Sequence, residues 1–297
     1  MHMTCAPTCT CGPSAVTYID IGFARAPSRR CDVQAYDAAR PSTSGLCTIN
    51  GAISVQIRLA MALRILAGGS YLDVAVMFGV GLPTVYQTVW MVVDDINRTP
   101  DVGPFLFPQE EFDCKGHAAR YKRKSTNGIF ASCVACVDGL FVKTQAPSPL
   151  DTSNVLGYYS GQKSVHGINV QAMCTADYRF TSMSAITPGA TNEWAAWNRF
   201  SLSRAVSRLP KGYYVLGDAA YLSDKLLTPY PGKNQPLGED TFNFHLSQLR
   251  VKIEQSFGIL VSTWGILWRP LRVQCARKCR RGRKQQQTDS RSNNGAA

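Results

Sequence analysis

Histidine and acidic residues are scarce in this sequence. Its 297 residues include 4 His and 20 Asp and Glu against 32 Lys and Arg, which leaves a formal net charge of +12. An excess of positive charge favours a polyanionic partner, and nucleic acid is the first candidate because phosphate neutralisation supplies most non-specific affinity. A basic surface that is merely solvated is the alternative interpretation.

Several kinds of site are missing. No Cys and His residues have the spacing of a zinc site, and no nucleophile elbow accompanies a suitably placed histidine, so zinc binding and serine or cysteine hydrolysis are disfavoured. The 11 Cys are odd in number and scattered. Cys133 and Cys136 form a CxxC, but on a strand their side chains are expected to point to opposite faces. We interpret the cysteines as small hydrophobic residues in a reducing compartment.

No membrane segment is expected either. The amino terminus lacks a basic region followed by an apolar one, so no signal peptide is predicted. Residues 74–93 carry no charge and are long enough to cross a bilayer, but Gly79, Gly81 and Pro83 interrupt them. We therefore interpret this stretch as two packed helices.

Three short helices are predicted in the first third of the chain. Apolar periodicity indicates helices over residues 53–67, 70–78 and 83–96. Glycines end the first two helices, a serine caps the second, and Pro83 suits the first turn of the third. The pattern resembles a helix-turn-helix, although plain helical bundles share it.

If this unit reads DNA, two side chains of its last helix are the candidates. Thr84 and Gln87 are of the type that faces a groove, whereas the remainder of that helix is apolar and is expected in the core.

Basic residues elsewhere are candidates for phosphate contacts. Arg120, Lys122, Arg123 and Lys124 end a charged helix just before the first long apolar run, and Lys163 follows an aromatic loop. A solvated helix end is the alternative interpretation of the first four.

Two apolar runs each stop on an aspartate. Asp138 and Gly139 close the run that begins at residue 133, and Asp218 closes the run that begins at residue 213. Such runs are typical of strands covered on both faces, so the two carboxylates are expected at the ends of neighbouring strands, at the rim of a sheet. Either aspartate alone is more simply a turn residue.

A third acid, Glu254, is predicted on a downstream helix. It lies beside the apolar stripe of that helix, where we expect it to be partly desolvated and to face the sheet. Three acids that converge suggest a site for divalent metal, because two cations about 3.5–4 Å apart cleave phosphodiesters readily. A pairing of Glu254 with Arg250 one turn earlier is the structural alternative.

The segments between these acids predict a mixed sheet. Alternation indicates a hairpin, and a strand, a covering helix and another strand imply a parallel crossover. The predicted segments are strands over 167–174 and 178–186, a helix over 191–209, a strand ending at 218, a loop over 226–239 and a helix over 246–264.

Composition divides the chain into five parts. The amino-terminal segment is rich in Cys, Pro, Ser and Thr, and the carboxyl-terminal one is rich in Arg and Lys, which suits nuclear import or phosphate affinity. The predicted parts are a disordered segment over 1–45, a helix-turn-helix-like unit over 46–98, a linker and basic helix over 99–131, an α/β domain over 132–273 and a basic disordered tail over 274–297.

Short motifs around the acids resemble the Harbinger (PIF) group of DDE transposases and their domesticated relatives. The resemblance covers roughly residues 132–273, and the helical unit before it also resembles that family's helix-turn-helix. The motifs are Val137-Asp138-Gly139, Lys143-Thr144-Gln145-Ala146-Pro147-Ser148, Tyr158-Tyr159-Ser160-Gly161, Ile168-Asn169-Val170-Gln171, Thr187-Pro188-Gly189-Ala190-Thr191, Gly217-Asp218-Ala219-Ala220-Tyr221 and the stretch from Leu246 to Gly258.

The resemblance implies a fold, a chemistry and partners. It implies a ribonuclease H-like α/β fold in which Asp138, Asp218 and Glu254 bind Mg²⁺, or Mn²⁺, and catalyse DNA strand cleavage and transfer. It also implies action in the nucleus, in some members with a Myb-like partner protein. Formation of a homo-oligomer is left open.

Two departures from the family pattern stand out, and the first favours an alternative function. The basic tail stands where the family continues past Arg272 with another core helix. Asn192-Glu193 stands where His-Asp or Asn-Asp is more usual, a change with no clear consequence for catalysis. The alternative function is a domesticated or truncated DNA-binding protein that no longer cuts.

Overall fold

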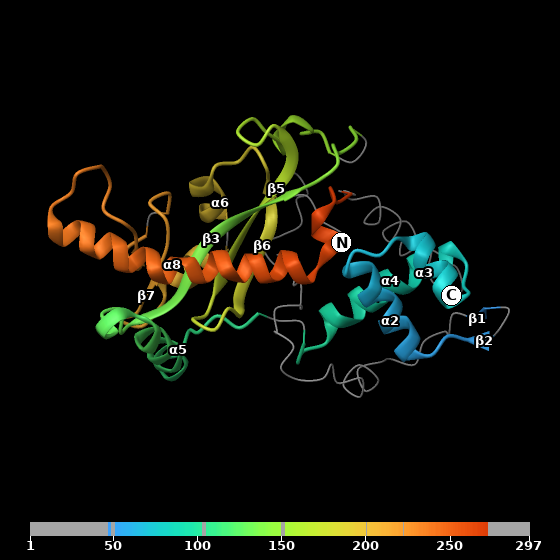
Figure 1. Ribbon diagram of the computed structural model, residues 1–297, viewed down its shortest axis with the longest axis horizontal. Coiled ribbons are helices and arrows are strands. Elements are labelled where there is room, and N and C mark those ends of the chain that lie inside the picture. The colour runs from blue at the N-terminus through green and yellow to red at the C-terminus, as the bar shows by residue number, and fades with distance from the viewer. Residues whose placement is uncertain are drawn as a thin grey trace, which may run out of the picture.

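A mixed sheet with helices on both faces lies beside a separate bundle of three helices (Figure 1). The computed structural model describes residues 47–48, 51–102, 105–149, 152–199, 201–221 and 223–272. The predicted amino-terminal segment and the basic tail lie almost entirely outside these residues.

The strands comprise a two-residue pair near the amino end and the strands of the main sheet. They are β1 Cys47–Thr48, β2 Gly51–Ala52, β3 Cys133–Lys143, β4 Tyr159–Ser160, β5 Val165–Cys174, β6 Phe180–Pro188, β7 Tyr214–Leu216 and β8 Leu226–Leu227.

The α-helices fall into an amino-terminal group and a group that flanks the sheet. They are α2 Val55–Leu66, α3 Tyr71–Phe78, α4 Leu82–Arg98, α5 Glu111–Lys124, α6 Glu193–Arg199, α7 Ser201–Ser207 and α8 Leu237–Thr263. Short 3₁₀ helices are η1 Thr126–Gly128, η2 Leu156–Tyr158 and η3 Gly265–Trp268.

Helices α2, α3 and α4 confirm the three predicted helices and are called the helical unit below. The Ser70 hydroxyl accepts a hydrogen bond from the Asp73 amide at 2.9 Å, which caps α3. Gly79 ends α3 with a left-handed φ of 63°, a conformation that glycine adopts without steric cost. Turns of this kind separate helices that residue periodicity alone would join.

The uncharged stretch is broken at that turn. No single helix among the described residues meets the length and composition of a membrane span, and only α3 and α4 taken together do so, across a bend of 103°. Their residues Val74, Val85 and Val89 pack in the core of the helical unit. The prediction of two packed helices is confirmed.

The main sheet has the strand order β4-β5-β3-β7-β8, with β6 paired to β5 on the side away from β3. Strands β3, β5 and β6 are antiparallel neighbours, whereas β7 and β8 run parallel to β3. The predicted hairpin, parallel crossover and mixed sheet are confirmed, and the architecture is the ribonuclease H-like α/β fold.

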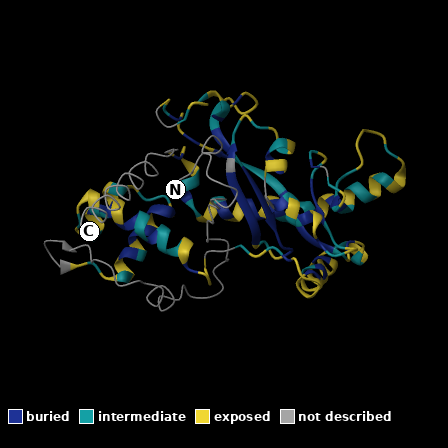
Figure 2. Ribbon diagram, turned by 180° about the vertical axis from the view of Figure 1, so that it is seen from behind, coloured by how far each residue is buried: buried dark blue, intermediate teal, exposed yellow. Residues whose placement is uncertain are grey.

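Each face of the sheet packs its own hydrophobic cluster, visible as the dark strands at the centre of Figure 2. Helix α8 covers one face with Leu249 and Ile253, and this group of side chains is called the α8 cluster. Helices α6 and α7 cover the other face with Trp197 and Val206. Because successive side chains of a strand point to opposite faces, one strand contributes residues to both clusters.

The prediction that Cys133 and Cys136 point to opposite faces is wrong. Both cysteines lie in the α8 cluster, while Val134 and Ala135 both pack on the opposite face. The register of β3 against β7 shifts between Cys133 and Ala135, and a bulge of this kind adds one residue and resets the alternation.

Three predicted boundaries also change. The predicted helix over 191–209 is divided into α6 and α7. Helix α8 begins at Leu237, nine residues before the predicted start at Leu246. The predicted loop over 226–239 contains β8, which extends the sheet by a parallel pair. Short pairings of two residues carry too little periodicity to be seen in a sequence.

Candidate active site

Asp138 lies in β3, and Asp218 follows the end of the adjacent parallel strand β7. The last paired residues of β3 and β7 are Cys136 and Leu216, and both face α8. Each aspartate follows two residues later, so alternation directs both carboxylates to the α8 side. We call Asp138 and Asp218 the aspartate pair.

The prediction that Asp138 lies at the end of its strand is wrong. Asp138 does not end β3: the strand continues to Lys143, and Asp138 is paired with Ala172 of β5. What ends there is the neighbour β7, whose pairing with β3 stops at Cys136. The carboxylate therefore emerges at an edge left open by a shorter strand.

Arg250 of α8 reaches both members of the pair. Its guanidinium lies 3.9 Å from Asp138 Oδ2 and 3.7 Å from Asp218 Oδ1. The Arg250 side chain is 16% exposed, against 18% for Asp138 and 41% for Asp218. The sequence suggests Arg250 only as a partner for Glu254, and among the described residues no ion pair joins those two.

Glu254 lies one helical turn beyond Arg250 and is exposed, so the prediction that it is partly desolvated is wrong. Its neighbour Ile253 is the buried residue of that turn. The negative charge of Glu254 nevertheless acts on Asp138, whose pKa it raises. Glu254 therefore lies at the solvent side of the aspartate pair.

A fourth acid, Glu193, belongs to the same site and was not predicted. It begins α6 on the opposite face of the sheet, and its Oε1 lies 3.6 Å from the point where a Cβ on Gly139 would stand. Because Gly139 has no side chain, the carboxylate can approach the strand beside Asp138. The sequence signal was its place two residues after the Thr187–Thr191 motif.

A buried chain of hydrogen bonds holds the floor of the site. The Tyr221 hydroxyl donates to Gln171 Oε1 at 2.6 Å, and the Gln171 amide donates to Asn169 Oδ1 at 2.8 Å. Asn169 in turn donates to the Thr191 carbonyl at 3.3 Å. The chain connects the segment after β7, strand β5 and the start of α6, and so fixes the elements that carry Asp218 and Glu193.

The electrostatics of the site raise the pKa of two of its carboxyls, Asp138 and Glu193. Burial, and then the charges of Glu254 and Asp218, raise the pKa of Asp138 against the opposing effects of the Gly139 amide and Arg250. Burial and the charges of the aspartate pair raise the pKa of Glu193. Groups of this kind bind protons, or a cation, more readily than isolated carboxylates.

Of the predicted basic residues, Lys163 is near this site, because its charge lowers the pKa of Glu193. The four residues of α5 lie elsewhere. Arg120 pairs with Asp177 at 3.9 Å, and Lys122, Arg123 and Lys124 are exposed in the last turn of α5.

Helix α8 separates these basic residues from the aspartate pair. Next to α5, Thr126 donates to Gln248 at 3.2 Å, and Lys252 donates to the Tyr178 hydroxyl at 2.8 Å. Gln248 and Lys252 each lie two residues from Arg250, about 200° around the helix. One side of α8 therefore faces the acids and the other faces α5.

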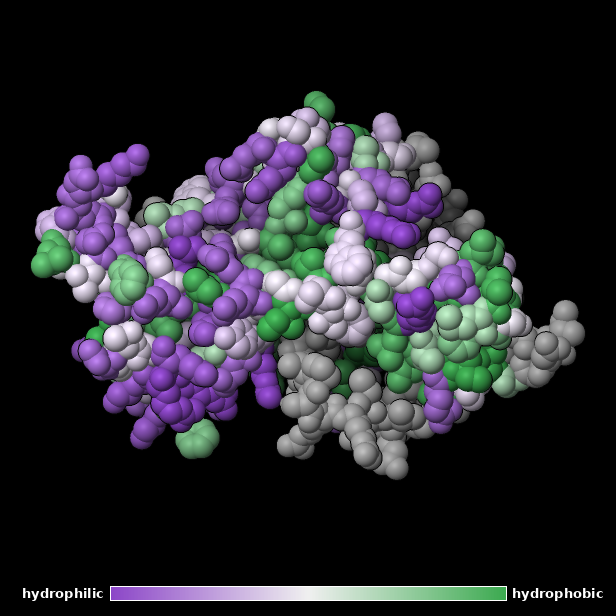
Figure 3. Space-filling view, viewed as in Figure 1, coloured by the Kyte–Doolittle hydropathy of each residue, from purple (hydrophilic) through white to green (hydrophobic). Residues whose placement is uncertain are grey.

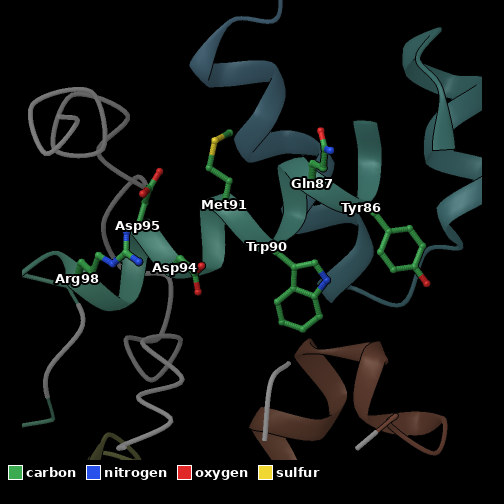
Figure 4. Close-up of a pocket in the computed structure, with 7 residues that line it drawn as sticks. All are labelled: Tyr86, Gln87, Trp90, Met91, Asp94, Asp95 and Arg98. Carbon is green, nitrogen blue, oxygen red and sulfur yellow. The ribbon is translucent and has the colours of Figure 1, made fainter. Parts of the chain in front are cut away.

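Thr84 and Gln87 lie in the first turns of α4, and Gln87 is exposed. Figure 4 shows that Gln87 projects from the same side of α4 as Met91 and Asp95, whereas Trp90 projects from the other. These residues, with Tyr86, Asp94 and Arg98, line a cavity of about 390 Å³. Two acidic side chains, Asp94 and Asp95, and one basic side chain, Arg98, thus follow Gln87 along its helix.

The surface of the helical unit is apolar rather than basic. Helix α3 exposes Leu72, Val76 and Met77, and this part of the molecule is predominantly green in Figure 3, while α5 is predominantly purple. Residues 51–102 contain three Arg and four Asp, a net charge of −1. The positive charge that attracts phosphates therefore comes from other parts of the chain.

Carboxylate oxygens are the donors that Mg²⁺ and Mn²⁺ prefer, and four carboxylates surround this site. Asp138, Asp218, Glu254 and Glu193 could supply ligands from both faces of the sheet. Among the described residues, however, no three His, Cys, Asp or Glu side chains are close enough together to hold an ion.

Comparison with known proteins gives a family match over the second half of the chain. Residues 137–282 are similar to the family described as "DDE superfamily endonuclease". The match begins one residue before Asp138 and extends past the predicted end of the α/β domain at residue 273.

A relative and the solved structures complete the comparison. The chain is 25% identical over 238 residues to a protein of Arabidopsis thaliana named "Protein ALP1-like". The alignment covers 73% of this chain and 56% of that relative, so the chain spans about half the length of the curated relative that it matches. No solved structure matches the chain at a significant level.

Proposed function

We propose that this chain is a metal-dependent nuclease of the Harbinger type that cleaves and transfers DNA strands, with Asp138, Asp218 and Glu254 as its catalytic acids. The observation that carries the proposal is the aspartate pair: Asp138 in β3 and Asp218 just after the adjacent parallel strand β7 both lie within 4 Å of one guanidinium. The match to a DDE endonuclease supports it, since such domains act on DNA through acids of this kind.

The residues fit a divalent metal by their chemistry. Asp138 and Asp218 would hold the ion from the sheet and Glu254 from α8, and Glu193 is an additional carboxylate within the same region. When bound, Mg²⁺ or Mn²⁺ lowers the pKa of water and neutralises charge on a phosphodiester. The half-buried position of Asp138 limits the access of bulk water to the reacting atoms.

The protein's own groups have separate tasks in this proposal. The backbone amide of Gly139 donates to Asp138 Oδ1 at 2.8 Å, and that of Ala219 donates to Asp218 Oδ1 at 2.7 Å. These bonds orient both carboxylates. Because Glu254 is exposed, a DNA strand could approach the aspartate pair from the side of Glu254 that faces solvent. Lys163, whose charge acts on Glu193, could contact a phosphate of that strand.

The proposal extends to the other partners. We propose that Thr84 and Gln87 contact bases, that the basic residues of α5 contact phosphates and that the protein acts in the nucleus. A Myb-like partner protein would supply further DNA specificity, as the motif resemblance implies. The apolar surface of the helical unit supports contact with a second protein.

The test is cleavage of labelled DNA by the purified full chain with Mg²⁺ or Mn²⁺. We expect Asp138→Asn and Asp218→Asn each to reduce the rate by about 10²–10³-fold, since removal of one electrostatic group from a preorganised site has an effect of this size. Lys252→Gln, on the other side of α8, is the matched control and should retain activity. Full cleavage by either aspartate variant would refute the site.

A second function is favoured by one observation. Arg250 lies between the aspartates, and no three described acids are arranged to hold an ion, as expected for a domesticated DNA-binding protein that no longer cuts. The same assay separates the two. Salt-sensitive DNA binding without cleavage at any metal concentration would favour the binding protein.

A further inference from the structure

The Arg250 guanidinium lies between the two aspartates, in the position that a cation bound by both carboxylates would take. It enters from α8 and lies within 4 Å of an oxygen of each aspartate, although Asp138 lies in β3 and Asp218 follows β7. Its side chain is 16% exposed, so the charge is largely removed from water. A buried charge is retained only where opposite charges compensate for its loss of hydration.

The contacts of Arg250 are electrostatic rather than directed hydrogen bonds. Both ion-pair distances, 3.9 and 3.7 Å, exceed the usual 2.7–3.2 Å of an N–H···O hydrogen bond. Oδ1 of each aspartate already accepts from a backbone amide. Arg250 Nε is buried and has no hydrogen-bond partner in the part of the chain that the structure describes. The guanidinium can therefore leave this position without breaking a close hydrogen bond.

A divalent ion and this guanidinium cannot share the position. Mg²⁺ takes carboxylate oxygens at about 2.0–2.1 Å, whereas the guanidinium now separates the two carboxylates. Both neutralise the same aspartate charges, to which Glu193 and Glu254 add further negative charge. Binding of one is therefore in competition with binding of the other.

We propose that Arg250 is a built-in counter-ion of the aspartate pair, which occupies the cation position in the metal-free protein and is displaced when a divalent metal binds. Arg250 thereby positions the aspartates and lowers the affinity of the site for metal. This inference rests on the proposed function, because it assumes that the aspartate pair binds the metal.

The experiment measures Mn²⁺ binding by calorimetry, and the rise in Tm on adding Mn²⁺, for the full-length wild type, Arg250→Gln and Lys252→Gln. We expect Arg250→Gln to bind Mn²⁺ about tenfold more tightly than the wild type, a difference of about 1.4 kcal/mol, and to gain more Tm from the metal. Its metal-free Tm should be lower, because the acids then repel one another. Lys252→Gln, which loses only its bond to Tyr178, should bind Mn²⁺ like the wild type.

The outcomes distinguish this inference from the proposed function. Equal or weaker Mn²⁺ binding by folded Arg250→Gln, beside clear binding by the wild type, overturns the role of Arg250 and leaves the nuclease proposal standing. Binding by neither protein overturns both, whereas binding by the variant alone supports the counter-ion.

If Arg250→Gln does not fold, Arg250→Lys replaces it. Lysine keeps the charge but lacks the planar group that spans two carboxylates. We expect tighter Mn²⁺ binding than in the wild type here as well, and unchanged affinity would overturn the proposal.

Discussion

Single residues of this site are understood only together with their neighbours. Asp138 is a carboxylate on a strand between two hydrophobic layers, and its charge is tolerated because the Gly139 amide and Arg250 oppose the cost of burial. Glu193 has a similar environment but comes from the opposite face, through the space left by Gly139. Because Gly139 has no side chain, the Glu193 carboxylate can lie close to the strand beside Asp138.

The raised pKa of Glu193 predicts a pH-dependent stability. Burial, Asp138 and Asp218 raise it, so the folded protein holds this proton more tightly than the unfolded chain, and stability falls as pH rises through the raised pKa. Glu193→Gln removes this loss. With EDTA present, we expect the variant to have a higher Tm than the wild type at pH 7 and the same Tm below about pH 4.

Thermal unfolding at a series of pH values checks this expectation. A Tm advantage that persists unchanged at low pH would show that the substitution acts through packing and not through the charge. No advantage at pH 7 would place Glu193 outside the influence of the aspartates.

At the scale of elements, α8 is the helix on which the site depends. It buries Leu246, Leu249 and Ile253 against the sheet and presents Arg250 to the aspartates and Lys252 to the hairpin. Periodicity predicted this buried stripe, because every apolar residue of it faces the same way. Periodicity did not predict the helix start, because the first turns project beyond the sheet with exposed residues such as Leu237.

Two glycines, Gly258 and Gly189, are expected to respond in opposite ways to replacement by alanine, one with a gain and the other with a loss of stability. Gly258 lies inside α8, and no atom lies within 4 Å of the position that an added Cβ would take, so Gly258→Ala should stabilise the protein by about 0.5–1 kcal/mol through helix propensity. For a domain of this size that corresponds to a Tm increase of about 2–4 °C per kcal/mol. Thermal unfolding of the full chain measures it.

Gly189→Ala is the matched comparison. A Cβ there would stand 2.7 Å from the Gly167 carbonyl oxygen and 2.8 Å from the Phe141 ring. Because backbone cannot move aside easily, we expect a loss of about 1–3 kcal/mol. Equal stability of the two alanine variants would contradict the close approach of β5 and the end of β6.

At the scale of the whole molecule, charge is unevenly distributed. The chain has a net charge of +12, while residues 51–102, which include the helical unit, contribute −1 and expose apolar side chains. The unit packs on the rest of the protein near η3, where Ile266 joins its core and Gly265 meets Gly68 at backbone distance. Affinity for phosphates and recognition of sequence are therefore expected from different parts of the chain.

That division predicts separable effects on DNA binding. Replacing Lys122, Arg123 and Lys124 with Gln should weaken binding to every sequence and reduce the salt slope by about 0.7–0.9 for each phosphate that is no longer neutralised. Replacing Thr84 and Gln87 with Ala should reduce preference for the cognate end sequence and leave the slope unchanged. Binding isotherms on cognate and scrambled DNA between about 50 and 200 mM salt measure both. A changed slope in the second variant, or changed preference in the first, would contradict the division.

The amino-acid sequence alone determined which segments are helices and strands, where Ser70 and Gly79 bound a helix, and that Asp138 and Asp218 follow buried runs. Each of these depends on neighbours within a few residues, through side-chain periodicity, capping and backbone sterics. The family motifs could be recognised for the same reason, since they are contiguous.

Only the tertiary structure decided which charges meet. The bulge that puts Cys133 and Cys136 on one face depends on pairing with β7, and the open edge at Asp138 depends on where β7 stops. Arg250 and Glu193 approach the aspartates from opposite faces of the sheet. Residues far apart in the chain interact only after packing has fixed their distances and excluded water, so neither their contacts nor their pKa shifts can be inferred from spacing along the chain.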